Sequence, residues 1–363
     1  MLTSSLIISC CLRVSAGLGN EDDDVRTFVE SVGSEAVKAD RIVGLSIGVA
    51  RGDEILVAEG FGLASVELDV PATADTVYRI GSITKEFTAA AILLLVEEGK
   101  VSLDGSLTTY LPDYPEAGDS VTIRHLLQHT SGVVDFTRLP AYRHERPLEV
   151  SQEQVLNRFQ DLPLEFPPGD KHRYCNSGYF LLGLVVERAS GVSFKEFVEQ
   201  RLFRKLGMLS TYCDSSQRII PRRAAGYSQW GGTLRNAAHI NLNQTVGAGN
   251  LSATVKDLIL WQRGLVAHRL ITAQSIGSML ARGKLNDGKP FDYGLGIRTG
   301  RLDGQKVIRH GGGISGFRSD VAYYPDSEIT IAVAANSEHA NTKAISDRIA
   351  RHLMKQDDRK RED

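Results

Sequence analysis

Short segments near both ends of the chain carry the alternating or continuous apolar runs that are typical of β-strands. The first two are joined by Arg51-Gly52-Asp53, which we interpret as a hairpin turn and not as an integrin ligand. The others occur only toward the C-terminus. The predicted strands are residues 44–50, 55–61, 307–309, 317–324 and 329–335.

Segments with helical periodicity separate these two groups of strands. Residues 22–39 predict an N-terminal helix, and residues 83–98 predict an apolar-faced helix that ends at Gly99. Residues 103–243 mostly show helical patterns broken by Pro and Gly, and residues 343–354 predict a closing helix. Strands at both ends with helices between them favour an α/β lobe that is interrupted by an all-helical lobe.

The pattern therefore predicts a single domain of the α+β class over residues 21–355. Its α/β lobe takes about residues 21–102 and 245–355, and its helical lobe takes about residues 103–244. A chain of 363 residues is long enough to bury a sizeable core in such a two-lobed arrangement. The densely charged residues 356–363 predict a solvated tail.

Residues 1–20 leave two interpretations open. The apolar run Leu6 to Leu12 and the small residues at Val14-Ser15-Ala16 are typical of a secretory leader and its cleavage site. No Lys or Arg precedes the apolar run, which favours a disordered start instead. A genuine leader implies a secreted or periplasmic protein, and otherwise we expect a cytoplasmic one.

Composition narrows the classes of partner. The chain is 42% hydrophobic and 24% charged, with a net charge of −2, and it has no long basic stripe, which argues against nucleic acid. Beyond the N-terminus no apolar run is long enough for a stable membrane span. Without the leader cysteines only Cys175 and Cys213 remain, which is no disulfide framework, and we interpret Cys175 as a buried structural thiol.

The candidate chemistry begins at Ser82-Ile83-Thr84-Lys85, just before the apolar helix. Residues at i and i+3 share one helix face, so the Lys85 amine can lie beside the Ser82 hydroxyl. A serine is a poor nucleophile until a neighbouring group takes its proton, and a lysine can do so when its pKa is lowered. A lone SxxK match is a weak signal.

Two later segments strengthen the signal from the SxxK match. Tyr174-Cys175-Asn176 places a phenol and a side-chain amide two residues apart. His310-Gly311-Gly312-Gly313 precedes a strand-like segment, and its glycines allow close approach of the backbone to a ligand. SxxK followed by polar and K-T-G-type elements is typical of penicillin-recognising enzymes.

With these elements in this order, the chain resembles the serine β-lactamase and DD-peptidase superfamily, in the class C-like branch with D-alanyl-D-alanine carboxypeptidases, D-aminopeptidases and related esterases. The resemblance runs from about Ile42 to Asn336 and implies a β-lactamase/transpeptidase-like fold, with an antiparallel sheet flanked by helices. Segments without catalytic groups share it, including Ile123 to Gly132, Pro168-Gly169, Lys205-Leu206-Gly207-Met208, Gly247-Ala248-Gly249 and Tyr293-Gly294-Leu295-Gly296.

The resemblance also implies a role for each candidate. Ser82 is the nucleophile that forms an acyl-enzyme, and Lys85 helps to accept its proton. Tyr174 is the expected general base for acylation, provided that cations such as Lys85 lower its pKa from about 10. Asn176 holds Lys85 and the substrate amide. The backbone of Ser82 and Gly313, next to Gly312, forms an oxyanion hole, and no metal or cofactor is expected.

His310 departs from the K-T-G triplet of class C β-lactamases and matches the H-x-G form of the peptidase and esterase members. A histidine near pKa 6.5 offers a substrate carboxylate only a pH-dependent charge, and Gly311 lacks the hydroxyl of the middle residue. Both changes lower the expectation of efficient β-lactam hydrolysis.

Two other patterns have competing interpretations. Gly44-Leu45-Ser46-Ile47-Gly48 matches the nucleophile elbow of α/β-hydrolases, but Ser46 lies within a predicted strand and the HGGG-like run follows it instead of preceding it. His125 and His129 are spaced as a zinc pair, yet no third ligand follows, and we expect capping and packing roles.

We therefore expect a DD-peptidase-like or esterase-like serine hydrolase that acts on a small amide, an ester or a D-amino-acid peptide. The alternatives are a class C-type β-lactamase and a penicillin-binding sensor that acylates once and deacylates very slowly. An inert scaffold is a fourth reading, which the intact set of candidate residues disfavours.

Overall fold

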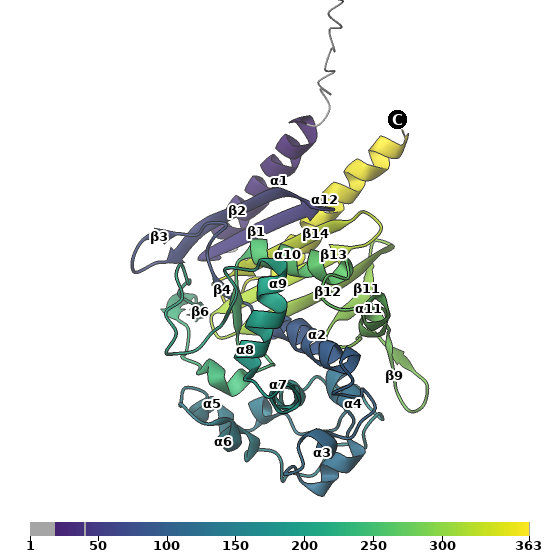
Figure 1. Cartoon of the computed structure of the whole chain (residues 1–363). Helices are drawn as coiled ribbons and strands as arrows, with labels where there is room; N and C mark the ends of the chain where they lie inside the picture. Colours follow the sequence, from purple (N-terminus) through teal and green to yellow (C-terminus); the bar gives the residue numbers. More distant parts are fainter. Residues whose placement is uncertain (1–18, 40, 363) are drawn as a thin grey trace, which may run out of the picture.

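The structure is a computed structural model that describes residues 19–39 and 41–362 (Figure 1). Most of the predicted leader, with its apolar run and its cysteines, lies outside the described residues. Within them the chain forms a layered α/β lobe and, below it in Figure 1, a lobe of short helices.

A seven-stranded antiparallel sheet is the centre of the α/β lobe, in the order β11-β12-β13-β14-β1-β2-β3. β1 pairs with both β2 and β14, so the two ends of the chain build one sheet. The strands are β1 (Gly44–Arg51), β2 (Glu54–Ser65), β3 (Val70–Pro71), β11 (Arg298–Leu302), β12 (Gln305–Ile314), β13 (Phe317–Tyr324) and β14 (Ile329–Ala335).

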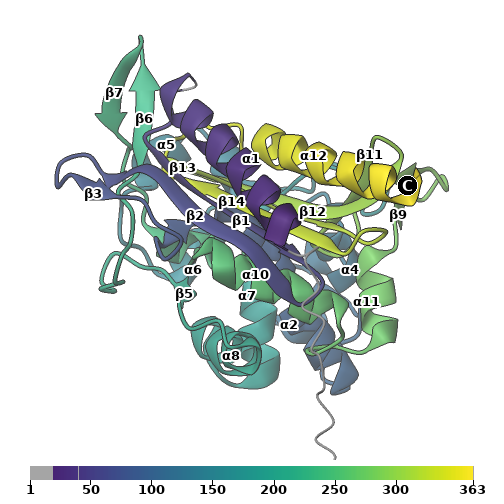
Figure 2. The same cartoon turned by 90° about the horizontal axis from the view of Figure 1, so that it is seen from above.

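Helices cover both faces of this sheet (Figure 2). α1 (Gly19–Lys38) and α12 (Thr342–Glu362) lie on one face, whereas α2 (Thr84–Glu97) and α10 (Val255–Val266) lie toward the other. Because successive strand side chains point to opposite faces, Ile331 and Val333 enter the core under α1 and α12, and Ala332 enters the core on the α2 side. Burial on both faces explains why β14 is a continuous apolar run instead of an alternating one.

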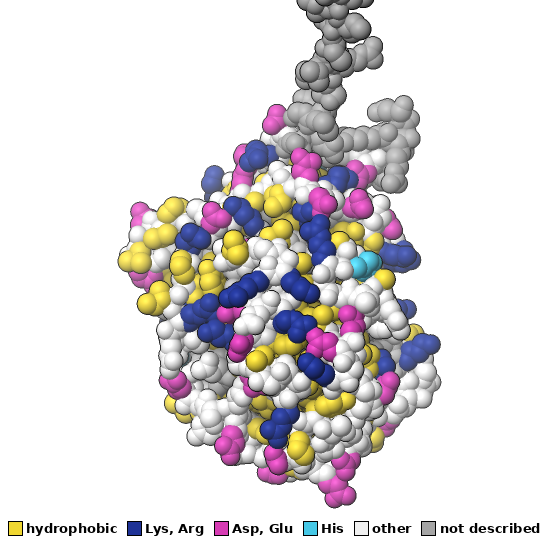
Figure 3. Space-filling view, viewed as in Figure 1, with side chains coloured by type: hydrophobic (Ala, Val, Ile, Leu, Met, Phe, Trp, Pro, Cys, Tyr) yellow, Lys and Arg dark blue, Asp and Glu magenta, His cyan; other side chains and the backbone are white. Residues whose placement is uncertain are grey.

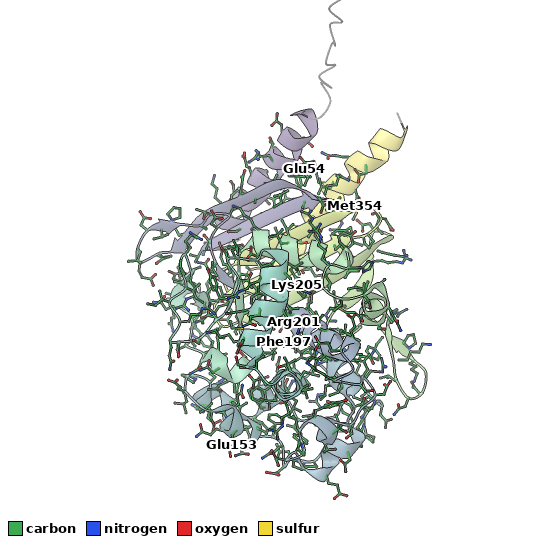
Figure 4. The ribbon with its side chains drawn as sticks, in the orientation of Figure 1. Glu54, Glu153, Phe197, Arg201, Lys205 and Met354 are labelled. Carbon is green, nitrogen blue, oxygen red and sulfur yellow. The ribbon has the colours of Figure 1, made fainter. Side chains whose placement is uncertain are left out.

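The second lobe is made of short helices around the buried α7 (Asn176–Ser190). α8 (Phe194–Val198) continues through a π-helical turn, Glu199–Phe203, into α9 (Arg204–Leu206). Figure 4 labels residues along this stretch, where the Arg201 guanidinium lies 5.3 Å from the ring of Phe197 and pairs with Glu98. The other helices of this lobe are α3 (Leu107–Tyr110), α4 (Ile123–Leu127), α5 (Tyr142–Glu145) and α6 (Gln152–Leu156). α11 (Ala273–Leu280) lies beside β11 in Figure 1.

Small strands connect the lobes. The short sheet β4-β8-β5 leads into the segment before α2, and the hairpins β6–β7 and β9–β10 project from the surface (Figure 2). Their bounds are β4 (Tyr78–Arg79), β5 (Tyr212–Cys213), β6 (Tyr227–Trp230), β7 (Thr233–Asn236), β8 (Leu251–Ala253), β9 (Gly283–Lys284) and β10 (Pro290–Phe291). On the face shown in Figure 3, Lys and Arg are interspersed with Asp and Glu.

The predicted elements are largely confirmed, with three corrections. The strand predicted over residues 307–309 is β12, which continues through the glycine run to Ile314 because the β13 ladder holds it there. Residues 103–244 also contain a β-hairpin, β6–β7. The closing helix predicted over residues 343–354 is α12, which continues through the charged tail to Glu362, and Asp357 forms an ion pair of 3.0 Å with Arg51.

A buried carboxyl group on α2 makes the stability of the fold depend on pH. Glu86 is fully buried, its Oε2 accepts a hydrogen bond from Trp261 Nε1, and burial raises its pKa to about 8. The unfolded chain ionises this group near 4.5, so the native state binds the extra proton between about pH 4.5 and 8. Its contribution to stability is therefore complete below pH 4.5 and is lost as the pH rises to about 8.

We expect Glu86→Gln to flatten this part of the pH dependence, since a neutral amide can still accept from Trp261. Denaturant unfolding of the wild type and the variant at pH 5 and pH 8.5 measures the change in unfolding free energy of each protein. The wild type should lose more unfolding free energy than the variant between these pH values. Equal losses would mean that Glu86 ionises as readily in the folded protein as in the unfolded chain.

Candidate active site

Ser82 lies where β12 meets the start of α2. It occupies the short 3₁₀ turn Gly81–Ile83 that leads directly into the helix, where the dipole favours developing negative charge. Gly81 has a φ of +50°, and a Cβ placed on it would lie 2.9 Å from the backbone nitrogen of Gly313. Only a glycine before the serine therefore lets the oxyanion strand come this close.

The Lys85 amine lies behind Ser82 and is fully buried. Nζ is 2.7 Å from the Ala248 carbonyl oxygen, 3.0 Å from Asn176 Oδ1 and 3.3 Å from Ser82 Oγ. Burial lowers the pKa of Lys85 to about 7, although the charge of Asp135 opposes this shift. In its neutral form the amine can donate to the first two oxygens and aim its lone pair at Ser82.

The side chains of Asp135 and Thr137 hold Asn176 in place. Its Nδ2 donates to Thr137 Oγ1 at 3.0 Å and to Asp135 Oδ2 at 3.3 Å, which turns its Oδ1 toward Lys85. Asp135 is 3% exposed and also accepts from the backbone nitrogen and the hydroxyl of Thr137. Asp135 was not predicted from the sequence, because it lies 41 residues from Asn176 and no motif marks it.

Tyr174 lies against Lys85, with the Nζ atom 4.8 Å from the ring centroid. Its hydroxyl is buried and makes no hydrogen bond of normal geometry with a described residue, although Ser82 lies near enough to lower its pKa slightly. Burial outweighs this effect and raises the pKa of Tyr174 above its ordinary value. The base role expected for Tyr174 requires a net lowering of its pKa, which burial prevents although the charge of Arg298 acts in that direction, so Lys85 is the better-suited base for the serine proton.

The glycine run of β12 places a backbone donor beside the nucleophile. A Cβ on Gly312 would lie 1.9 Å from the Ile80 carbonyl oxygen, so a side chain there would push β12 away from Ser82. β11 pairs with β12 only as far as Arg309, which leaves the edge from His310 to Ile314 unpaired on that side. The predicted oxyanion hole of Ser82 and Gly313 is thus sterically accommodated.

His310 points into the same centre but differs from its expected behaviour. It is 2% exposed, its Nε2 is 3.0 Å from Tyr293 Oη, and its Nδ1 is 2.7 Å from the Gly311 carbonyl oxygen. Burial and the nearby Lys85 lower its pKa to about 3. The ring is neutral across the physiological range, so the expected pH-dependent charge for a substrate carboxylate is absent.

A different cation is near this position. Arg298, the first residue of β11, is exposed, and its guanidinium lies 5.3 Å from the ring centroid of Tyr293. Its charge lowers the pKa values of both Tyr174 and His310, and it makes no ion pair with any described residue. Together with Arg318 it borders a cleft of about 790 Å³ along the glycine run, whose acidic lining residues are Asp320 and Glu338.

The competing patterns take structural roles. Ser46 is buried within β1 and bonds to the Thr73 carbonyl oxygen, so it is no nucleophile elbow. His125 completes the capping box of α4 with Thr122, as expected. Burial raises the pKa of Cys175 to about 12, as suits a structural thiol.

The described residues contain neither a metal-binding cluster nor a membrane-spanning helix. No group of three or more His, Cys, Asp or Glu side chains there could hold a metal ion. None of the helices in the described part of the chain combines the length and the apolar character needed to cross a membrane.

The family model described as Beta-lactamase matches residues 25–355. Penicillin-binding protein 4* of Bacillus subtilis is 28% identical over 305 residues, covering 80% of this chain and 67% of that protein. A D-aminopeptidase of Gluconobacter oxydans is 27% identical over 315 residues, covering 85% of this chain. The chain spans only 59% of the length of that D-aminopeptidase.

Solved structures show the same similarity. The octameric penicillin-binding protein homologue from Pyrococcus abyssi has a TM-score of 0.79 and 27% identity, covering 92% of this chain and 77% of that one. A D-stereospecific amidohydrolase from Streptomyces has a TM-score of 0.76 and 25% identity, covering 88% of this chain and 96% of that one. The fold predicted from the sequence is therefore confirmed.

Proposed function

Because the chain belongs to the beta-lactamase family, we propose that it is a serine hydrolase that cleaves a small amide or ester through an acyl-enzyme on Ser82. The observation that carries this proposal is the buried Lys85 amine, 3.3 Å from Ser82 Oγ and with its pKa lowered to about 7. A lysine in this state is neutral often enough near pH 7 to remove the serine proton.

The expected sequence of steps uses groups already in place. Neutral Lys85 takes the Ser82 proton while Oγ attacks the substrate carbonyl, and the backbone N–H groups of Ser82 and Gly313 stabilise the oxyanion. The proton then passes to the leaving group, directly or through the Tyr174 hydroxyl. Water attacks the acyl-enzyme with the same base and restores Ser82.

Substrates built from D-amino acids are the first to examine, since relatives are a D-aminopeptidase and a D-stereospecific amidohydrolase. Arg298 favours those with a free carboxylate on the leaving group, because its guanidinium lies 5.3 Å from the ring of Tyr293 and its positive charge acts on Tyr174 and His310. The neutral His310 and the missing hydroxyl at Gly311 disfavour efficient β-lactam turnover.

A time course with excess benzylpenicillin distinguishes a peptidase, a sensor and a β-lactamase. Intact mass measures the protein adduct, and the amount of hydrolysed drug is measured in the same samples. A long-lived adduct supports a peptidase or a sensor, and rapid appearance of hydrolysed drug supports a β-lactamase. The peptidase and sensor readings then separate on N-acetyl-D-alanyl-D-alanine, which only the peptidase turns over. If that peptide, p-nitrophenyl acetate and benzylpenicillin all fail to acylate or turn over, the hydrolase proposal is wrong.

We expect Arg298→Ala to lower kcat/KM for N-acetyl-D-alanyl-D-alanine by about 10- to 100-fold, the worth of one charge-assisted hydrogen bond. The same dipeptide with a C-terminal carboxamide should be affected by less than about threefold. Arg301→Ala is the matched control, because Arg301 is exposed on the same strand and bonds only to its own turn at Gly304. Equal losses on acid and amide would contradict a carboxylate contact.

A further inference from the structure

A continuous chain of hydrogen bonds lies behind the catalytic residues. Cys175 N is 3.1 Å from His129 Nδ1, and His129 Nε2 is 3.1 Å from Tyr293 Oη. Tyr293 Oη is 3.0 Å from His310 Nε2, and His310 Nδ1 is 2.7 Å from the Gly311 carbonyl oxygen. The three side chains are at most 2% exposed, so bulk water does not compete for these bonds.

The backbone groups at the two ends determine where every proton lies. Cys175 N–H can only donate, so His129 Nδ1 must be unprotonated and His129 Nε2 must carry the proton. That proton is donated to Tyr293 Oη, whose own hydrogen is then donated to His310 Nε2. His310 Nδ1–H donates in turn to the Gly311 carbonyl oxygen, which can only accept. Burial lowers the pKa values of both histidines, so both rings are neutral, and with neutral rings only this arrangement satisfies all four bonds.

The chain joins the two halves of the active site. Its first donor, Cys175 N–H, lies between Tyr174 and Asn176, and the His129 ring lies 4.2 Å from the ring of Tyr174. Its last acceptor, the Gly311 carbonyl, lies two residues before the oxyanion donor at Gly313. His129 has a φ of +59°, a costly backbone conformation for a histidine that nevertheless persists here.

We propose that His129, Tyr293 and His310 are positioning residues, which hold Tyr174 and the oxyanion strand in fixed relation through one ordered set of protons. The catalytic consequence rests on the proposed function, whereas the proton arrangement does not. In this arrangement both ring nitrogens of His310 are occupied, so His310 orients β12 and does not bind the substrate.

The proton arrangement is testable in the unmodified protein. In ¹⁵N-histidine-labelled protein, long-range ¹H–¹⁵N spectra distinguish the two neutral imidazole tautomers. We expect His310 to be protonated at Nδ1 and His129 at Nε2, with the two rings assigned from the spectra of His310→Gln and His129→Gln. A His310 ring protonated at Nε2 would overturn the proposal, whether or not the protein hydrolyses any substrate.

The positioning role is testable with Tyr293→Phe, which keeps the ring and removes the central hydroxyl. We expect kcat for p-nitrophenyl acetate to fall by about 10- to 100-fold, as small displacements of catalytic groups do, with KM within about threefold. The His310 tautomer signal should change in the same variant.

Tyr324→Phe is the matched control, because Tyr324 is equally buried and its hydroxyl has no hydrogen-bond partner among the described residues. It should leave kcat and both tautomers unchanged. A normal kcat in Tyr293→Phe would overturn the positioning role. If that variant does not fold, the tautomers of the wild-type protein decide.

Discussion

Replacing Ser82 with alanine is expected to remove covalent acylation and to lower turnover by at least about 10⁴-fold, the loss typical of a missing nucleophile. The side chain is small and its main contact is the 3.3 Å approach of Lys85 Nζ, so the variant should fold normally. Intact mass with benzylpenicillin and steady-state rates with p-nitrophenyl acetate measure the two effects.

Ser46→Ala is the matched control for this experiment. Ser46 is fully buried and lies in β1, where its hydroxyl bonds to the Thr73 carbonyl and to Tyr78. Its loss should reduce stability and leave acylation intact. Adduct formation that survives in Ser82→Ala, or that disappears in Ser46→Ala, would place the nucleophile elsewhere.

Replacing Lys85 with methionine is expected to lower kcat/KM by about 10³- to 10⁴-fold. Lys85 must be neutral to accept the serine proton, so the rate of the wild type should rise with pH through a pKa of about 7. The variant has no such base, and the rise near pH 7 should disappear from its profile. Methionine is apolar and similar in length, so folding should not depend on the missing charge.

Rates between pH 5 and 9, with thermal melts at each pH, separate loss of the base from loss of the fold. Lys256→Met serves as the matched control, since the Lys256 side chain is 41% exposed and its amine pairs with Asp75. A variant that keeps the rise near pH 7 would assign that step to a group other than Lys85.

The sequence predicted the first and last residues of β13 and β14 correctly, because a turn between the two strand-like runs separates them clearly. It predicted the α2 boundaries closely, since Gly99, with a φ of +70°, stops the helix. It missed the length of β12, because a run of glycines offers no apolar pattern, and only pairing with β13 shows that it is a strand.

Among the candidate site residues, the positions of some were predictable from the sequence, whereas their protonation states were not. Ser82, Lys85 and Asn176 are brought within hydrogen-bonding distance, as their motifs predicted. The protonation states were not predictable, because the pKa values of Tyr174 and His310 depend on burial, which no local pattern gives. The sequence marks Tyr293 only as part of a segment that resembles the family, and its contact with two histidines depends on tertiary structure.

The pairing of β1 with β14 has a consequence for how the protein is made. The β1–β2 hairpin and the helix with Ser82 and Lys85 leave the ribosome early, whereas β12 and β14 are among the last segments synthesised. One edge of β1 therefore stays open while most of the chain is translated, and a nascent chain cannot acylate before its oxyanion strand emerges. An open edge of β1 during synthesis, and a nucleophile that stays silent until β12 emerges, both follow from this order of strands along the chain.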